Sequence, residues 1–166
     1  MKLIIIYMPS SEYLATFTTR ALIIHEDQLL VVRHANAHST HYALPGGKLE
    51  WEESLIEGLQ REIHEELNVE ANIDSLALVH EFVHPVYGWR RIEFFYTIKN
   101  SEDFLSLQNQ SENTSSHAFE LSEILWVNIS DIISGEIDLK PYCLRDLLAS
   151  KQLEYIQQFN PHYVSK

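Results

Sequence analysis

The segment from Gly47 to Val69 constrains this chain more than any other, because it joins a glycine turn to an amphipathic helix rich in glutamate. Apolar side chains recur there at every fourth position, at Leu55, Leu59, Ile63 and Leu67. That spacing places one apolar stripe along a helix, so it predicts a helix over residues 54–67 that packs against a core.

Three glutamates flank this stripe. Glu62, Glu65 and Glu66 are three and four positions apart, so their side chains emerge close together and can converge on one hard cation. They also lie in the last two turns, where the helix dipole makes an anion unfavourable by about 0.3–1 kcal/mol. Arg61 alone cannot neutralise three carboxylates that repel one another. We therefore interpret the cluster as a divalent-metal site assisted by Arg61, and not as a solvated acidic face.

The order of these residues resembles the Nudix box. Gly47 is followed after five residues by Glu53, and after seven more by the run Arg-Glu-Ile-His-Glu-Glu. The preceding Leu-Pro-Gly-Gly run supplies the usual turn. Asn68 departs from the pattern, which has glycine at this position. Because asparagine tolerates the left-handed conformation expected just past a helix, we expect the change to be conservative.

The resemblance implies an α/β fold of the Nudix type, an α/β/α sandwich with a mixed β-sheet. It also implies a Nudix pyrophosphohydrolase that uses Mg²⁺ or Mn²⁺, for which carboxylates are the preferred ligands. The implied metal ligands are Glu62, Glu65, Glu66 and the backbone carbonyl of Gly46.

The turn and the start of the helix have separate roles in this prediction. Gly46 and Gly47 let the backbone approach metal or phosphate where a Cβ atom would intrude. Glu53 lies nine residues before Glu62, about half a turn around the helix. We therefore expect Glu53 to pair with Arg61 and to fix the junction between loop and helix.

The resemblance further implies one more glutamate from a later loop, which completes the metal shell or acts as the base. The candidates are Glu112, Glu120 and Glu123. Glu120 lies just before a predicted strand, so it is held by the strand yet able to swing inward. Glu112 would cost more entropy to order, and Glu123 is an odd number of residues from Trp126 and would point to the other face. We assign the role to Glu120.

Further residues are candidates for substrate contacts. Arg33 lies at the end of a predicted strand and could bind phosphate or form a surface ion pair, and Arg20 is a weaker candidate of the same kind. Tyr87 and Trp89 lie near a predicted hairpin tip, where they could stack on a base or simply pack. Gly47, in the glycine turn, is a further candidate for a substrate contact. The sequence leaves these alternatives open.

The run from His80 to His84 matches the H-E-x-x-H pattern of zinc proteases. That pattern requires a helix, whereas Pro85 and the apolar residues around it predict a strand. Two histidines four apart on a strand, with about 3.3 Å per residue, cannot share one zinc ion. We therefore do not interpret this run as a zinc site.

Length and charge limit the possible partners. A chain of 166 residues predicts a single domain over residues 1–166. The net charge of −12 disfavours nucleic-acid polymers and anionic membranes, and it means that an anionic substrate needs metal ions or local cations. The single cysteine, Cys143, predicts a small core residue and fits a reducing cytoplasm.

The remaining patterns predict an α/β domain. Runs rich in β-branched and aromatic residues predict strands at residues 3–7, 17–25, 28–33, 77–83, 91–98 and 124–128, the first being too short to span a membrane. Helical spacing predicts further helices at 130–134 and 142–159. We expect a hairpin turn at 25–28, polar loops at 33–42 and 108–116, and Trp126 in the core.

These observations predict a metal-dependent hydrolase in which water attacks phosphorus. Its small-molecule substrate would be a nucleoside diphosphate linked to another moiety, as in a nucleoside triphosphate, a nucleotide sugar or a dinucleoside polyphosphate. The alternative is a non-catalytic Nudix-fold module that binds a nucleotide as a sensor, although such a module need not keep all three glutamates of the helix. Whether the chain acts alone or as a homodimer stays open.

Overall fold

The computed structural model describes residues 15–35, 39–86, 88–107, 110–111, 121–150 and 162–165. The strands are β1 (Ala15–Leu22), β2 (Ile24–His25), β3 (Gln28–Ala35), β4 (Thr40–Ala43), β5 (Ile73–Val83), β6 (Arg90–Ile98), β7 (Gln110–Ser111), β8 (Leu121–Asn128) and β9 (His162–Ser165). The helices are α1 (Leu55–Leu67), α2 (Ile129–Ser134) and α3 (Cys143–Ala149), with a 3₁₀ helix, η2, at Ser101–Leu107.

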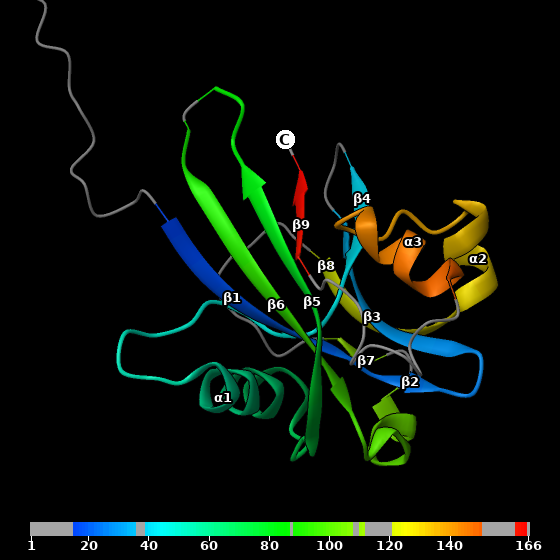
Figure 1. Ribbon diagram of the computed structural model, residues 1–166. Coiled ribbons are helices and arrows are strands. Elements are labelled where there is room, and N and C mark those ends of the chain that lie inside the picture. The colour runs from blue at the N-terminus through cyan, green and yellow to red at the C-terminus, as the bar shows by residue number, and fades with distance from the viewer. Residues whose placement is uncertain are drawn as a thin grey trace, which may run out of the picture.

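Two sheets lie at the centre of the fold (Figure 1). The first has the strand order β1-β6-β5-β9 and is mixed, because β1 runs parallel to β6 while β5 runs antiparallel to it. The second has the order β2-β3-β8-β7, with β4 paired to β3, and its pairings are antiparallel. The predicted α/β fold with a mixed sheet is thus confirmed.

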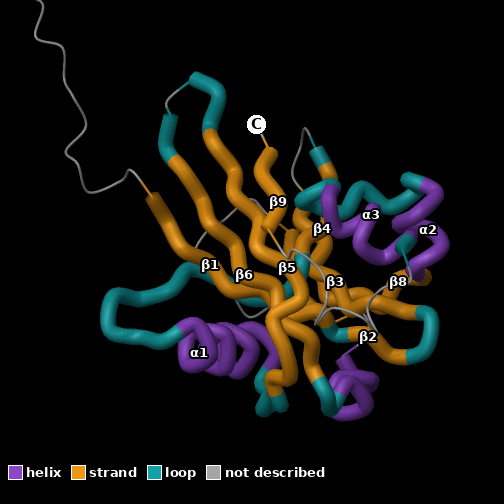
Figure 2. The backbone as a smooth tube through the Cα atoms, viewed as in Figure 1, coloured by secondary structure: helices purple, strands orange, loops and turns teal. Residues whose placement is uncertain are grey.

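Helices cover opposite sides of the sheets, with α1 on one side and α2 and α3 on the other (Figure 2). The fold has one hydrophobic core under α1 and another under α2 and α3. Strand β1 contributes to both because its side chains alternate between the two faces of the sheet. Ala21 and Ile23 pack with Leu59 and Ile63 of α1, whereas Leu22 packs in the core that contains α3. None of the helices in the described residues is long and apolar enough to cross a membrane.

Helix α1 is capped at both ends. Ser54 Oγ accepts a hydrogen bond from the Glu57 backbone N–H at 3.3 Å, and the Glu57 carboxylate accepts one from the Ser54 N–H at 2.9 Å, which together form a capping box. At the other end Asn68 adopts the left-handed conformation, with φ 53° and ψ 37°, and donates its N–H to the His64 carbonyl at 2.9 Å. The predicted helix and the predicted conformation of Asn68 are both confirmed.

We expect Asn68→Gly to change the free energy of unfolding by less than about 1 kcal/mol, because both residues accept the left-handed conformation. Hydrolytic activity should stay at the wild-type level. Urea denaturation and steady-state kinetics check this expectation. A large loss in either would reveal a role for the Asn68 side chain beyond the cap.

The structure differs from the sequence prediction around residues 33–42. In place of one polar loop, β3 continues to Ala35 and β4 begins at Thr40, with His34 opposite His41 in the antiparallel register. Polar side chains hide this hairpin because the end of β3 at His34 and strand β4 at His41 line a cavity, whereas the earlier residues of β3 are buried in the core. Strand β5 also begins four residues earlier than predicted, at Ile73, in a stretch whose register is irregular.

Some predictions concern residues outside the described part of the chain. The strand at 3–7 lies there, as does most of the loop at 108–116, of which Gln110–Ser111 pairs with β8. The predicted helix at 142–159 is described as α3 up to Ala149, and residues 151–161 lie outside. Trp126 and Cys143 are both buried, as predicted.

Candidate active site

The Gly46–Gly47 turn is pinned to strand β1 by backbone hydrogen bonds. The N–H of Thr19 donates to the Gly47 carbonyl and that of Ala21 to the Pro45 carbonyl, each at 2.9 Å. Gly46 has φ +118°, and a Cβ atom built on it would lie 2.2 Å from the Thr19 carbonyl oxygen. Only glycine fits this close approach of two backbones.

The acidic face of α1 lies directly against this turn. Glu66 Oε2 accepts a hydrogen bond from the Gly46 N–H at 2.9 Å. A Cβ atom on Gly47 would lie 2.3 Å from the carboxyl carbon of Glu62, so the missing side chain makes room for this carboxylate. The structure therefore brings Gly46, Gly47, Glu62 and Glu66 together.

Arg61 links the acidic side chains to one another. Its Nε lies 2.5 Å from Glu53 Oε1 and its Nη2 lies 3.0 Å from Glu53 Oε2, which is a bidentate pair. The guanidinium also donates to Glu62 at 3.0 Å, to Glu65 at 3.2 Å and to the Lys48 carbonyl at 3.1 Å. The hydrogen bond from Arg61 lowers the pKa of Glu53, and the bond from the Glu50 N–H adds to the effect. The expected pairing of Glu53 with Arg61 is present.

The oxygen donors at the turn suit a hard divalent cation. They are the Gly46 carbonyl and the carboxylates of Glu62, Glu65 and Glu66, and the room left at Gly47 keeps one carboxylate close to the backbone. Within the described residues, no three acidic, histidine or cysteine side chains already enclose a metal position. Glu65 lies outermost, with 59% of its side chain exposed. Metal binding would therefore require these side chains to turn away from Arg61 and the Gly46 N–H.

We expect Arg61→Lys to lower kcat/KM about tenfold and the free energy of unfolding by about 1–2 kcal/mol, because one ammonium cannot replace a bidentate, multiply bonded guanidinium. Kinetics and urea denaturation measure the two effects. Arg33→Lys is the matched control. Its single ion pair with Glu123 is 35% and 43% exposed on the two side chains, so its loss should cost under about 0.5 kcal/mol. Equal effects of the two substitutions would contradict the linking role of Arg61.

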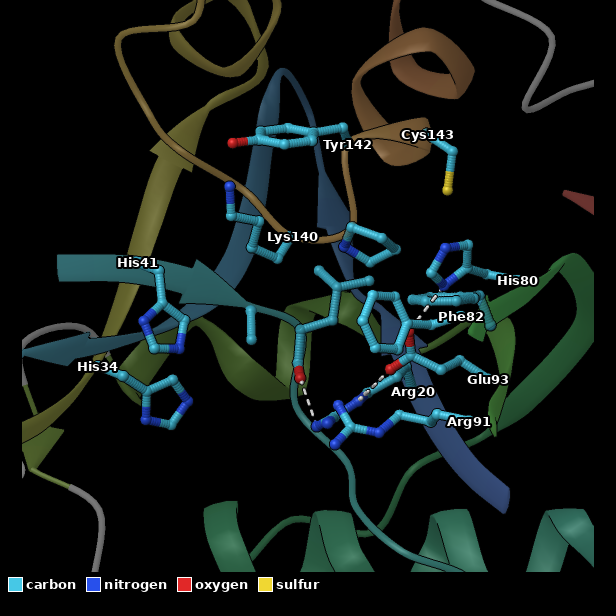
Figure 3. Close-up of a pocket in the computed structure, with 14 residues that line it drawn as sticks. Arg20, His34, His41, His80, Phe82, Arg91, Glu93, Lys140, Tyr142 and Cys143 are labelled. Carbon is cyan, nitrogen blue, oxygen red and sulfur yellow. Dashed lines mark hydrogen bonds and ion pairs between the residues drawn. The ribbon is translucent and has the colours of Figure 1, made fainter. Parts of the chain in front are cut away.

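A cavity of about 550 Å³ lies on the other face of β1, beside the turn (Figure 3). Strands β1, β3, β4, β5 and β6 and the segment 140–143 line it. Backbone hydrogen bonds join that segment to β4. The Tyr42 N–H donates to the Asp138 carbonyl at 3.1 Å, and the Tyr42 carbonyl accepts from the Lys140 N–H at 2.9 Å. Phe82 and Tyr142 give the cavity aromatic walls.

The cavity is rich in cationic side chains. Arg20, Arg91 and Lys140 line it, which supplies the positive charge that a chain of net charge −12 needs to attract an anion. One carboxylate, Glu93, is buried in its wall with His80 Nδ1 at 2.8 Å. Burial alone would raise the pKa of Glu93, but the bond to His80 and the charges of Arg20, His80 and Arg91 hold it below the usual value. Glu93 is therefore an ionised acceptor.

Of the residues predicted to contact substrate, some line the cavity and others have different partners. Arg20 lines the cavity. Arg33 does not line it and pairs with Glu123 at 2.5 Å, so in this structure it forms the ion pair that was its alternative. Trp89 packs between Phe82 and His84, with ring centroids 5.4 and 5.0 Å away, and the Arg91 guanidinium lies 5.7 Å from its ring centroid.

Three predicted residues, Tyr87, Glu112 and Glu120, lie outside the described residues. The H-E-x-x-H run lies largely on strand β5, as the sequence suggested, and its His80 bonds to Glu93 instead of facing His84 across one ion. Several cavity residues were not singled out as site residues from sequence, among them Phe82, Glu93 and Lys140. The alternation of Arg91, Glu93 and Phe95 on β6 was the available signal, because it places three of the lining residues on one face.

Comparisons with known proteins agree on one family. The sequence pattern of the NUDIX domain matches residues 16–148, whereas no curated protein matches the chain. Among solved structures, the E. coli ORF135 protein aligns with a TM-score of 0.62 and 18% identity over 89% of this chain and 97% of that one. The MutT protein from Methanosarcina mazei Go1 aligns with a TM-score of 0.58 and 23% identity over 88% and 99%. A UDP-X diphosphatase aligns with a TM-score of 0.58 and 19% identity over 95% and 70%.

The glycine turn, the capped acidic helix and the mixed sheet between helices define the Nudix hydrolase class, and the enzyme class expected from the sequence is confirmed. The chain belongs to the NUDIX domain family.

Proposed function

We propose that the protein is a divalent-metal-dependent hydrolase that cleaves a phosphoanhydride bond in a nucleoside diphosphate linked to another moiety. The observation that carries this proposal is the contact between the Gly46–Gly47 turn and the carboxylates of Glu62 and Glu66. It places backbone and carboxylate oxygens at one point beside a cationic cavity. MutT proteins and a UDP-X diphosphatase among the similar folds are consistent with substrates of this class.

Glu62, Glu65, Glu66 and the Gly46 carbonyl would hold Mg²⁺ or Mn²⁺. Such an ion, when bound, neutralises charge on phosphate oxygens and favours the formation of hydroxide near neutral pH. Arg61 holds the carboxylates of Glu53, Glu62 and Glu65 close to the turn. Glu62 and Glu65 would exchange this contact for the metal ion, while Glu53 would keep Arg61 in place. The cations of the cavity attract the anionic substrate and orient it toward the turn.

In the reaction, the oxygen of a water molecule forms a bond to phosphorus and the bond from phosphorus to the bridging oxygen breaks. The bridging oxygen leaves with the departing phosphate. One proton of the water passes to a glutamate carboxylate, and Glu120, assigned from the sequence, either takes this role or completes the metal shell. A nucleoside triphosphate gives a nucleoside monophosphate and pyrophosphate, or a nucleoside diphosphate and phosphate. A nucleotide sugar gives a nucleoside monophosphate and a sugar phosphate, and a dinucleoside polyphosphate gives two nucleotides.

The test is a hydrolysis assay with nucleoside triphosphates, nucleotide sugars and dinucleoside polyphosphates, each with Mg²⁺, with Mn²⁺ and with EDTA. We expect metal-dependent release of phosphate, pyrophosphate or a nucleoside monophosphate from at least one class. Hydrolysis that persists in EDTA would overturn the metal assignment. Binding without hydrolysis across the panel would support the nucleotide-sensor alternative.

A further inference from the structure

The Gly46 carbonyl already has a cation on it, the guanidinium of Arg20. Nη1 of Arg20 donates to the Leu44 carbonyl at 3.2 Å and also to the Gly46 carbonyl. Arg20 projects from β1 into the cavity, and 21% of its side chain is exposed. Figure 3 shows it between the turn and the buried Glu93. The carbonyl that the proposed function gives to the metal is therefore held by a positive side chain of the protein itself.

The carboxylate of Glu93 is a second acceptor within reach of Arg20. The Nε of Arg20 is 3.9 Å from Glu93 Oε1, and Thr18 Oγ1 lies 3.5 Å from the same oxygen. The other carboxylate oxygen of Glu93 binds His80. A guanidinium has five donors on a long side chain. Arg20 can therefore release the Gly46 carbonyl and pair more closely with Glu93, so that its positive charge stays paired with a negative one.

A guanidinium and a divalent ion cannot both occupy the Gly46 carbonyl, because like charges at that separation repel strongly where water is partly excluded. An incoming phosphate offers Arg20 a bidentate partner inside the same cavity. Resting on the proposed function, we propose that Arg20 is an internal cation that competes with the divalent metal for the Gly46 carbonyl. A phosphate-bearing ligand in the cavity withdraws it, so metal and ligand each strengthen the binding of the other.

The test measures binding of Mn²⁺ by electron paramagnetic resonance, without turnover. Arg20→Gln removes the competing charge, so it should bind Mn²⁺ about tenfold more tightly than the wild type. Glu93→Gln removes the acceptor to which Arg20 retracts, so it should bind Mn²⁺ less tightly. These opposite signs distinguish competition from a structural role, because loss of a structural contact would weaken binding in both variants.

Nucleoside monophosphates, namely AMP, GMP, CMP and UMP, are the second probe. In the wild type, the one that binds should raise the affinity for Mn²⁺, and in Arg20→Gln this gain should disappear. Arg90→Gln is the matched control, because Arg90 is an exposed arginine of β6 that lies opposite Ala15 of β1, away from Arg20, and pairs with Glu81. It should bind Mn²⁺ as the wild type does.

The outcomes separate the two proposals. A wild type that binds no Mn²⁺ would overturn the proposed function. A wild type that binds Mn²⁺ while Arg20→Gln binds it equally or more weakly would overturn the competition and leave the proposed function standing. Circular dichroism establishes that each variant is folded. If Arg20→Gln is not, folded Glu93→Gln decides the question: weaker Mn²⁺ binding that the bound nucleoside monophosphate reverses supports the competition, because its phosphate replaces the lost acceptor of Arg20. Unchanged or tighter binding, or weaker binding that the monophosphate does not reverse, overturns it.

Discussion

Glu66→Gln and Glu62→Gln are each expected to lower kcat by at least about 100-fold on the substrate identified in the panel. Glutamine keeps a carbonyl oxygen that can accept the Gly46 N–H now bound by Glu66, so the substitution removes the negative charge and leaves the shape of the site. Kinetics at saturating Mg²⁺ measure the loss.

The same substitutions should leave thermal stability in EDTA unchanged or higher, because they relieve repulsion near the end of a helix where anions are unfavourable. Glu70→Gln is the control. Its side chain is 85% exposed and pairs with His64 away from the turn, so activity should be unaffected. Activity of both Glu62→Gln and Glu66→Gln within a few-fold of the wild type would refute the assignment of these residues.

Gly46→Ala is expected to lower the free energy of unfolding by at least about 3 kcal/mol, from strain at positive φ and from the clash with backbone. The new Cβ would lie 2.2 Å from the Thr19 carbonyl oxygen. Neither β1 nor the turn can yield alone, because backbone hydrogen bonds join them at Thr19 and Ala21. Urea denaturation measures the loss, and hydrolysis should fall to background.

Gly88→Ala provides a matched comparison. Gly88 also has a positive φ, +69°, but a Cβ atom there meets nothing within 4 Å. It should therefore cost only the strain of the left-handed conformation, about 1–2 kcal/mol. If Gly46→Ala and Gly88→Ala lose the same stability, close packing of the turn against β1 is not what requires glycine at position 46.

The acidic helix could be predicted from sequence because its determinants are local. The apolar stripe, Ser54 with Glu57 three residues later, and Asn68 at the end all act within a few positions of one another. The pairing of Glu53 with Arg61 followed from the same helix geometry. Longer-range partners depend on register. Arg33 faces Glu123 because β3 and β8 pair in that register, and no pattern within either strand reveals the partner.

The cavity was out of reach for a related reason. Its residues come from five strands and from a segment about a hundred positions further along the chain than β4. What assembles them is the backbone pairing of Tyr42 with Asp138 and Lys140, and backbone hydrogen bonds leave little trace in side-chain identity. Polar residues on β3 and β4 even suggested a loop, since strands that border a cavity lack the alternation of a half-buried sheet.

The alternation of side chains along β1 separates the proposed metal ligands from the cationic cavity. Ala21 of β1 packs under α1, which carries the proposed ligands, while Arg20 faces the cavity lined by the segment 140–143. Substitutions in that segment can therefore change what the cavity admits while the carboxylates of α1 stay in place. Relatives of this chain that share its acidic helix but differ at Lys140 or Tyr142 are expected to perform one reaction on different molecules, and exchanging the segment between them should transfer preference without loss of turnover.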